Sequence, residues 1–345
     1  MDIKSGEPNF DKRKGILAGI LAGVIVLCAA VFYFIYDGLG ARPSGEVIDV
    51  VIPKEATGKE ISSMLAEHGI ISDGLAFRVV LAITGEGKKL QSGHYHLRQG
   101  LSIRQAVEAL HEGADEYITI TIPEGYTVKQ MAEVLKKAGI AGGNSFEETA
   151  AAYGPLPWQY GPVAVPIRGE GFLFPDTYDV PLAYDAKQIC DMMYRHMDDM
   201  ITADIRQAAE KKPLTLYALI TLASMVEREA RLKEDQVPIA SVMLARLKAG
   251  MPLQIDATVQ YALGETKPEV TLEDTKVDSP YNTYLYRGLP PGPIGAPGMD
   301  AIRAVLAAEP GEYLYYVAEK DGHHVFTKTL EEHQAETRRI YGESS

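Results

Sequence analysis

Two glutamates close an apolar stretch of the chain, LTLYALITLASMVEREA at residues 214–230. The stretch suits a helix that is buried on most sides. Glu227 extends an apolar stripe through Ala223, and a carboxyl group at the end of such a stripe is partly desolvated, which raises its pKa toward the range of a general acid. Glu229 follows Val226 at a similar spacing but faces another direction, so the spacing leaves both glutamates as candidates. The alternative is that the Glu-Arg-Glu triplet at 227–229 simply closes the helix on a solvated face.

Polar side chains that could orient a substrate follow in two further segments. MPLQIDATV at 251–259 places Gln254, Asp256 and Thr258 at alternating positions, which share one side of an extended chain. Asp256 could instead cap the helix that follows. The segment 279–298 combines aromatic, amide and hydroxyl groups with a Pro/Gly loop, a mixture that suits a sugar cleft but is also common in plain connectors. Its candidate binding residues are Tyr281, Asn282 and Thr283.

Three histidines near the C-terminus, His323, His324 and His333, raise the question of a metal site. His323 and His324 are adjacent, so on a strand they point to opposite faces, and no metal-ligand spacing is present. The sequence therefore predicts no metal and no cofactor. His324 is instead predicted to form hydrogen bonds in the fold or in the substrate cleft.

The N-terminal part contains a stretch that is long enough to cross a membrane. Residues 16–36 carry no charge and no proline, and a helix of this length spans about 30 Å. The basic residues in 1–15 and the positive-inside rule predict a cytoplasmic tail, with residues 37–345 outside. The apolar run is too long, and too aromatic at its end, for a typical cleaved signal peptide. We therefore expect an uncleaved, single-pass membrane anchor.

The overall composition limits the function classes. The net charge of −13 argues against nucleic acid as the main partner, because a phosphate backbone is bound by Lys and Arg. A neutral or polar glycan is compatible with an acidic surface. The two cysteines, Cys28 and Cys190, do not indicate a disulfide framework, since the first lies in the apolar stretch.

A repeated α/β pattern follows a linker at 37–46. IPKEATGKEISSMLAEHGI (52–70) aligns without gaps to IPEGYTVKQMAEVLKKAGI (122–140), and GLSIRQAVEAL (100–110) is a partial third copy. Each unit reads as a strand, a proline turn, a capped helix and a glycine stop. Such units resemble LysM-like modules, which bind glycans containing N-acetylglucosamine. The alternative is an internal duplication with packing value only.

The remaining region, 143–345, is predicted to be mixed but mostly helical. Within it, a hairpin around Asp321-Gly322 is expected to precede a C-terminal helix. In the preceding region, a short strand is expected at Val47–Ile52. The fold class is therefore α+β, with one transmembrane helix, a LysM-like region at 47–142 and a larger domain at 143–345. The predicted helices of that domain are 185–208, 212–230, 236–249 and 256–263.

These segments together resemble the MltG (YceG-like) family of endolytic peptidoglycan transglycosylases. ASMVEREA, LQIDATVQYALG, SPYNTY and GLPPGPIGAPG follow one another as in that family. IPEGYTVKQMAEVL, GEGFLFPDTY and GHHVFTKTLEEH are similar to its other blocks, so the resemblance covers about residues 45–335. Ala257, where the family often has proline, and Gly295-Ala296, which replaces a more polar pair, are departures that concern loop geometry.

The resemblance implies a lyase that cleaves the β-1,4 bond between N-acetylmuramic acid and N-acetylglucosamine in nascent peptidoglycan and so ends strand elongation. The family's catalytic glutamate is the first acid of the block that reads ASMVEREA here, which favours Glu227. That one carboxyl group would protonate the glycosidic oxygen and then accept the C6 hydroxyl proton, closing a 1,6-anhydro ring without water. No second carboxylate is evident as the nucleophile that most retaining glycosidases need.

The resemblance also implies partners: peptidoglycan strands, lipid of the bacterial plasma membrane, and neighbouring synthases of the cell wall. The residues that would orient the sugar are the polar ones named above: Gln254, Asp256, Thr258, Tyr281, Asn282, Thr283 and His324. Two other functions stay open. One is a non-catalytic glycan-binding scaffold of the synthesis machinery, and the other is a muramidase-type hydrolase that releases reducing ends.

Overall fold

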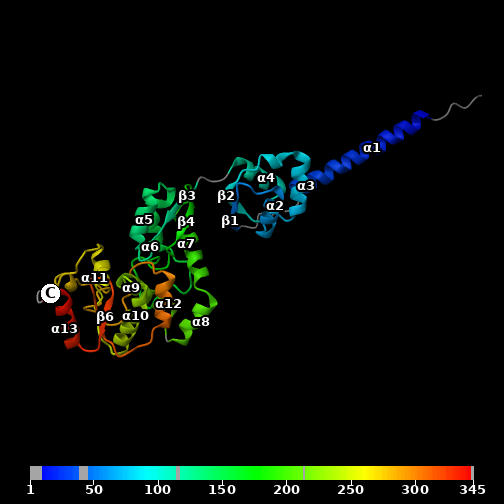
Figure 1. Cartoon of the computed structure of the whole chain (residues 1–345). Helices are drawn as coiled ribbons and strands as arrows, with labels where there is room; N and C mark the ends of the chain where they lie inside the picture. The colour runs from blue at the N-terminus through cyan, green and yellow to red at the C-terminus, as the bar shows by residue number, and fades with distance from the viewer. Residues whose placement is uncertain (1–9, 39–45, 114–116, 213, 343–345) are drawn as a thin grey trace, which may run out of the picture. The chain divides into compact units, whose positions relative to one another are not determined.

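The computed structural model describes residues 10–38, 46–113, 117–212 and 214–342 (Figure 1). It divides into two compact units, Met1–Tyr117 and Ile118–Ser345. Both units combine helices with short two-stranded sheets, which confirms a mixed α and β fold.

The first unit begins with one long apolar helix. Helix α1 covers Phe10–Tyr33 and continues into a π-helical turn, η1, at Phe34–Gly38. The window Ile20–Asp37 has a mean hydropathy of 2.3 and is long and apolar enough to cross a membrane. The prediction of a single apolar helix at the N-terminus is therefore confirmed for the described residues, although the helix starts before residue 16.

The rest of the first unit is a small α/β core. Strands β1 and β2 pair antiparallel, with Val50 opposite Tyr95, and both of these side chains are buried. Buried leucine, isoleucine and phenylalanine side chains from the three helices complete the core. The elements are β1 (Val47–Ile52), α2 (Gly58–Glu67), α3 (Gly74–Thr84), the 3₁₀ turn η2 (Glu86–Lys88), β2 (Gly93–Arg98) and α4 (Ile103–Glu112).

The sequence repeat reappears as repeated local structure. Thr57, Ser102 and Thr127 each form a capping box at the start of α2, α4 and α5 (Val128–Lys137). In each box the side chain accepts a backbone N–H of the first turn, and a Glu or Gln side chain returns a bond to the cap residue. The predicted strand, turn and capped helix are thus present in both full copies.

The two full copies lie in different units, which differs from the predicted grouping of 47–142. Residues 118–142 belong to the second unit, because Ile122 of the repeat and Met131 of α5 are buried in the core of that unit. The local signals of the two copies are the same, but their buried side chains pack against different partners. A LysM-like function for the first unit stays a prediction.

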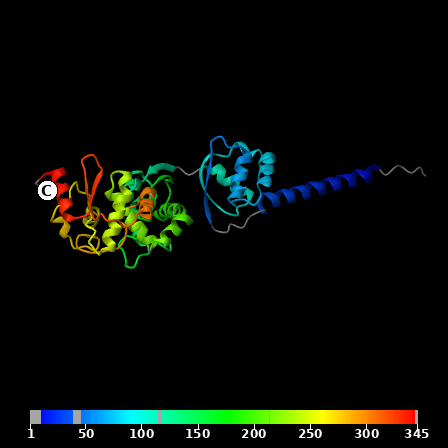
Figure 2. The same cartoon turned by 60° about the horizontal axis from the view of Figure 1, so that its bottom comes forward.

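The second unit carries most of the helices around one large core (Figure 2). The predicted helix 185–208 is in fact two helices, because α7 ends at buried Ile201, whose backbone leaves the helical region, and α8 begins after Thr202. The elements are β3 (Tyr117–Thr121), α5, η3 (Ala141–Asn144), α6 (Phe146–Ala152), β4 (Thr177–Pro181), α7 (Ala186–Met200), α8 (Ala203–Lys211), α9 (Leu216–Glu229), α10 (Lys233–Lys248), α11 (Asp256–Leu263), η4 (Asp274–Lys276), α12 (Met299–Ala307), β5 (Tyr315–Ala318), β6 (His324–Thr327) and α13 (Leu330–Tyr341).

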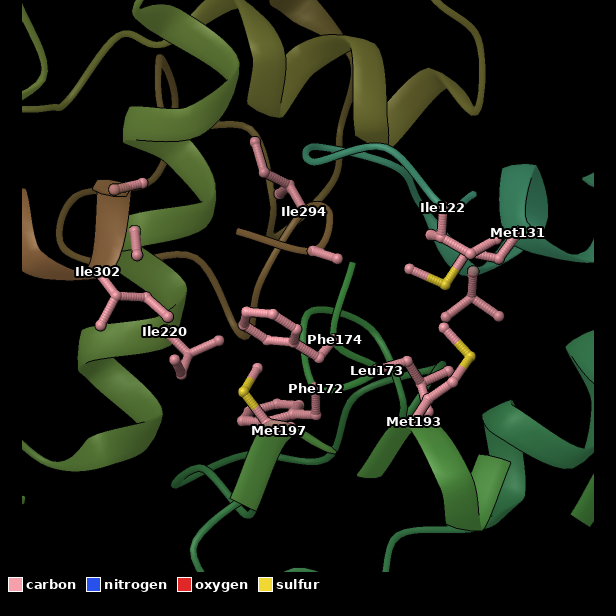
Figure 3. Close-up of a cluster of buried hydrophobic side chains, with 14 of the residues drawn as sticks. Ile122, Met131, Phe172, Leu173, Phe174, Met193, Met197, Ile220, Ile294 and Ile302 are labelled. Carbon is pink, nitrogen blue, oxygen red and sulfur yellow. The ribbon is translucent and has the colours of Figure 1, made fainter. Parts of the chain in front are cut away.

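Helix α9 runs through the middle of this core. Its side chains from Leu219 to Val226 are all buried, which explains the absence of charge in that stretch. Figure 3 shows Ile220 of α9 close to Ile302 of α12, and Phe172 and Phe174 among side chains from α7 and α9. Segments far apart in the sequence therefore fix the position of α9 and of the glutamates at its end.

Gly142 provides a test of how closely the second core is packed. A Cβ atom at this residue would lie 2.3 Å from the backbone nitrogen of Ala186, at the start of α7. Backbone cannot move aside cheaply, so Gly142→Ala is expected to lower the free energy of unfolding by about 2–3 kcal/mol. The free energy of unfolding can be measured by urea denaturation in detergent, followed by the fluorescence of Trp158, the one tryptophan of the chain. Gly311→Ala, where a Cβ meets nothing within 4 Å, should have little effect; equal losses in both variants would contradict the packing argument.

Candidate active site

The last turn of α9 places Glu227 and Glu229 in different surroundings. Thr215 caps the start of the helix, and Val226 is the last fully buried side chain before the two glutamates. Both carboxyl groups lie at the C-terminal end of the helix, where the helix dipole disfavours negative charge. Their separate contacts then distinguish them.

Glu227 faces the loop that precedes α12. Its Oε2 accepts a hydrogen bond of 3.1 Å from the backbone N–H of Gly298. Burial raises its pKa, the Gly298 N–H lowers it, and the charges of Glu124 and Asp300 raise it further. The turn at Gly125 lies against its side chain, at 3.7 Å from Cγ to the position of a Gly125 Cβ.

Glu229 faces the hairpin of β5 and β6 and the start of α11. Its Oε2 accepts a hydrogen bond of 3.0 Å from the hydroxyl of Tyr316. Burial raises the pKa of Glu229 to about 7, Tyr316 lowers it and the charge of Asp256 raises it. The Ala257 N–H and Arg228 also favour the ionised form. A carboxyl group with this pKa exchanges its proton readily near neutral pH, as a group that acts in turn as acid and base requires.

Glu229 also lines two neighbouring cavities of the second unit. The first has a volume of about 390 Å³ and the second about 350 Å³, and they share Glu229, Asp256 and Tyr316. A third cavity of about 510 Å³ shares Arg228 and Gln260 with the second. The three cavities therefore follow one another past the end of α9. Glu227 lines none of these three.

Gln254 and Asp256 both line the 390 Å³ cavity, whereas Thr258, predicted to share their side, does not line it, and the segment is not a straight strand. Gln254 has a left-handed backbone, with φ of 55°, and Asp256 is already the first residue of α11. The cap position of α11 is Ile255, so Asp256 is not the N-cap. Its Oδ1 accepts a bond of 2.6 Å from the Tyr284 hydroxyl, which holds it toward the cavity.

Comparisons with known proteins identify the family of this chain. The profile of the YceG-like family matches residues 50–339. This chain belongs to the YceG-like family. It is 34% identical over 309 residues to the endolytic murein transglycosylase of Bacillus subtilis, covering 85% of this chain and 84% of that protein.

Two further relatives extend the comparison. The chain is 30% identical to the endolytic murein transglycosylase of Streptococcus pneumoniae, over 84% of its own length and 58% of that longer protein. It also matches the crystal structure of a protein from Listeria monocytogenes described as yceG-like, with a TM-score of 0.59 and 32% identity. That match covers 84% of this chain and 98% of the Listeria chain.

In this member of the YceG-like family, three of the predicted binding residues have partners inside the protein. Thr258, Asn282 and Thr283 are almost fully buried. The hydroxyls of Thr258 and Thr283 lie 2.9 Å apart, and the Asn282 amide donates to two carbonyls of the 275–277 turn. These contacts fix the loop after α11, so substrate contact by these three side chains stays a prediction.

Tyr281 and His324 lie on different cavities. Tyr281 lines the 510 Å³ cavity, and its ring packs on that of Tyr261 at 4.8 Å between centroids. The His324 side chain is 4% exposed and lines the 350 Å³ cavity, with Nδ1 at 2.8 Å from Oδ2 of Asp235. Among the described residues there is no group of three His, Cys, Asp or Glu side chains that could hold a metal ion.

Several residues of these cavities were not singled out from the sequence of this YceG-like protein. Arg246 lines the 390 Å³ cavity and is held by the Leu253 carbonyl at 2.6 Å. Glu170 is 2% exposed and lines the 510 Å³ cavity, and its carboxylate accepts bonds from the Val128 N–H and the Tyr261 hydroxyl, each at 3.1 Å. Burial raises the pKa of Glu170 to about 7. The only sequence signal for Glu170 was its place in the GEGFLFPDTY block.

Proposed function

We propose that this chain is a membrane-anchored endolytic murein transglycosylase in which Glu229 is the acid and base. One observation carries the proposal: a carboxyl group with a pKa near 7 lines consecutive cavities beside polar and aromatic side chains. Cavities that pass the acid on more than one side suit cleavage within a strand rather than at its end. The names of the Bacillus and Streptococcus relatives support the same activity.

The reaction follows from a single carboxyl group. Protonated Glu229 gives its proton to the glycosidic oxygen as the bond from C1 of N-acetylmuramic acid to that oxygen breaks. The resulting carboxylate takes the proton from the C6 hydroxyl of the same sugar while O6 bonds to C1. The products are a 1,6-anhydro end and a free hydroxyl on N-acetylglucosamine, and no water is consumed. The negative charge of Asp256, which faces the same cavity, would stabilise positive charge at C1.

The resemblance favoured Glu227 as the acid and base. The surroundings of the two side chains support Glu229 instead. Glu227 accepts a hydrogen bond from the Gly298 N–H, lies near the charges of Glu124, Asp300 and Lys233, and lines none of the three cavities described above. Gln254, Asp256 and His324 instead share cavities with Glu229. Because the two side chains have different surroundings, substituting each one separately shows which of them is the acid and base.

The surroundings of the reaction are part of the proposal. Helix α1 would anchor the protein in the plasma membrane with its N-terminus in the cytoplasm and residues 37–345 outside. The first unit, with the full copy that contains α2 and the partial copy that contains α4, would bind glycan as LysM-like modules do. A glycan strand is the substrate, and a synthase of the cell wall would be a neighbour because nascent strands are the target.

Product mass tests the reaction class directly. The full chain in detergent is incubated with purified peptidoglycan, and the released fragments are analysed by mass spectrometry. Anhydro ends, lighter than reducing ends by one water, are the expected result. Reducing ends would make the protein a muramidase-type hydrolase, with Asp256 as the second carboxylate to examine. Absence of any product would favour the scaffold function.

Tyr316→Phe is expected to shift the pH profile upward. The Tyr316 hydroxyl stabilises the carboxylate of Glu229, so its removal raises the pKa of Glu229. The acid then keeps its proton to higher pH, and the alkaline limb of kcat/KM moves up while the maximal rate falls by about tenfold or less. Tyr315→Phe, at the same cavity but not bonded to Glu229, is the matched control. A limb that stays in place in Tyr316→Phe would rule out Glu229 as the titrating acid.

A further inference from the structure

Helix α3 carries an exposed row of large apolar side chains. Leu75, Val79 and Ile83 are 62%, 45% and 66% exposed, and their four-residue spacing puts them on one helix face. The opposite face is buried in the core of the first unit. The buried side chains are Phe77, Val80 and Leu81.

An apolar outer face is unusual for a helix that is already packed on its other side. The segment Gly74–Thr84 is a short apolar helix of 11 residues, with Arg78 as its one charged residue. Such a segment is too short to span a membrane and is typical of a core helix or an interfacial helix. Since the outer face of α3 is open, the helix has the form of an interfacial helix.

Helix α3 lies where the membrane anchor enters the first unit. Phe32, Ile35 and Tyr36, at the end of α1 and in η1, pack on the same core as the inner face of α3. Residues of η1 contact both α3 and α4, and Asp37 accepts a bond of 2.7 Å from Arg104 of α4. Figures 1 and 2 both show α3 at the end of this unit from which α1 leaves. The end of the anchor, in η1, therefore packs directly on this part of the unit.

We propose that the exposed face of α3, formed by Leu75, Val79 and Ile83, inserts into the outer surface of the lipid bilayer. This rests on the proposed role of α1 as a membrane anchor. The occupant is lipid because the end of the apolar anchor, in η1, packs directly on α3 and α4, so that α3 lies next to the point where the anchor leaves the bilayer. Insertion of an apolar helix face by a few ångströms removes these side chains from water. The first unit is then held against the membrane in one orientation.

Spin labels on the full chain in lipid vesicles test the docking. A label at Ile83→Cys, in a Cys28→Ala background, is compared with one at Glu67→Cys on the exposed side of α2. Cys190 is buried and remains in place. The collision rate with oxygen, which dissolves in lipid, and with a water-soluble nickel complex is measured for each label. The ratio of the oxygen collision rate to the nickel collision rate should be several-fold higher for the label at Ile83 than for the label at Glu67.

Further labels separate docking from anchoring. A label on native Cys28, which is exposed on α1, reports whether the anchor is in the membrane. Lipid exposure at Cys28 with water exposure at Ile83 would overturn the docking and leave the anchor intact. Shielding of Ile83 from both reagents would also overturn it, in favour of a protein partner. In a double variant with Leu75→Ser and Val79→Ser, the label at Ile83 is expected to collide more often with the nickel complex. The label at Cys28 should remain exposed to lipid.

Discussion

Glu229→Gln is expected to abolish strand cleavage, with a loss in kcat/KM of about 10³-fold or more. The same carboxyl group gives a proton in the first step and accepts one in the second, and glutamine can do neither. Glutamine keeps the size of the side chain and can accept the bond from Tyr316, so the cavities should retain their shape. The release of anhydro fragments from peptidoglycan, followed over time, measures the loss.

Glu227→Gln is the matched control for this experiment. Glu227 is in the same helical turn but bonds to Gly298, so its loss should reduce the rate by about tenfold or less. If Glu227→Gln removed activity and Glu229→Gln left it, the acid would be Glu227, as the resemblance alone favoured. The reaction class, judged by the anhydro ends, would be unaffected by that outcome.

Stability distinguishes a chemical loss from a folding defect in Glu229→Gln. Because the folded pKa of Glu229 is raised above its unfolded value, its protonated form contributes stability that is present at low pH and lost as pH rises through about 7. The glutamine variant does not ionise and keeps that contribution. It should therefore be at least as stable as the parent protein at pH 8. A lower melting temperature at pH 8 would contradict this.

Much of the local structure could be predicted because its causes are local. The strand Val47–Ile52 and the helix Asp256–Leu263 have the predicted bounds, and the hairpin turns at Gly322, whose φ is 98°. Each of these follows from apolar spacing, a cap or a glycine in a turn. The membership of 118–142 in the second unit could not be predicted, because both copies of the repeat carry the same local signals.

The candidate site was harder to predict for a related reason. Residues two apart on a helix differ by about 200° in direction, so the sequence separated Glu227 from Glu229 without showing which side chains surround each of them. Tyr316, whose hydroxyl bonds to Glu229, lies 87 residues further along the chain. Residue type was also insufficient for Thr258 and Thr283, since a hydroxyl that suits a sugar equally suits another buried hydroxyl.

Arg228→Met is expected to destabilise the second unit in a pH-dependent way. Arg228 is partly buried, and its charge lowers the pKa of both Glu170 and Glu229. Without it, the two buried carboxyl groups would lack their cation when they ionise. We expect a loss of about 3 kcal/mol at pH 8.5 in urea denaturation followed by Trp158 fluorescence.

The sign of the pH effect follows from the two carboxyl groups. At pH 5 both are protonated in the folded protein, since burial raises their pKa values to about 7, and the charge of Arg228 has little to stabilise. As pH rises through 7 the parent protein gains the attraction of Arg228 for each carboxylate, and the variant does not. The cost of Arg228→Met should therefore be small at pH 5 and grow with pH. Arg231→Met, an exposed neighbour, should cost about 0.5 kcal/mol or less at either pH. An equal cost of Arg228→Met at both pH values would mean that Arg228 acts by packing and its weak bonds to Ile294 and Gln260, and not by its charge.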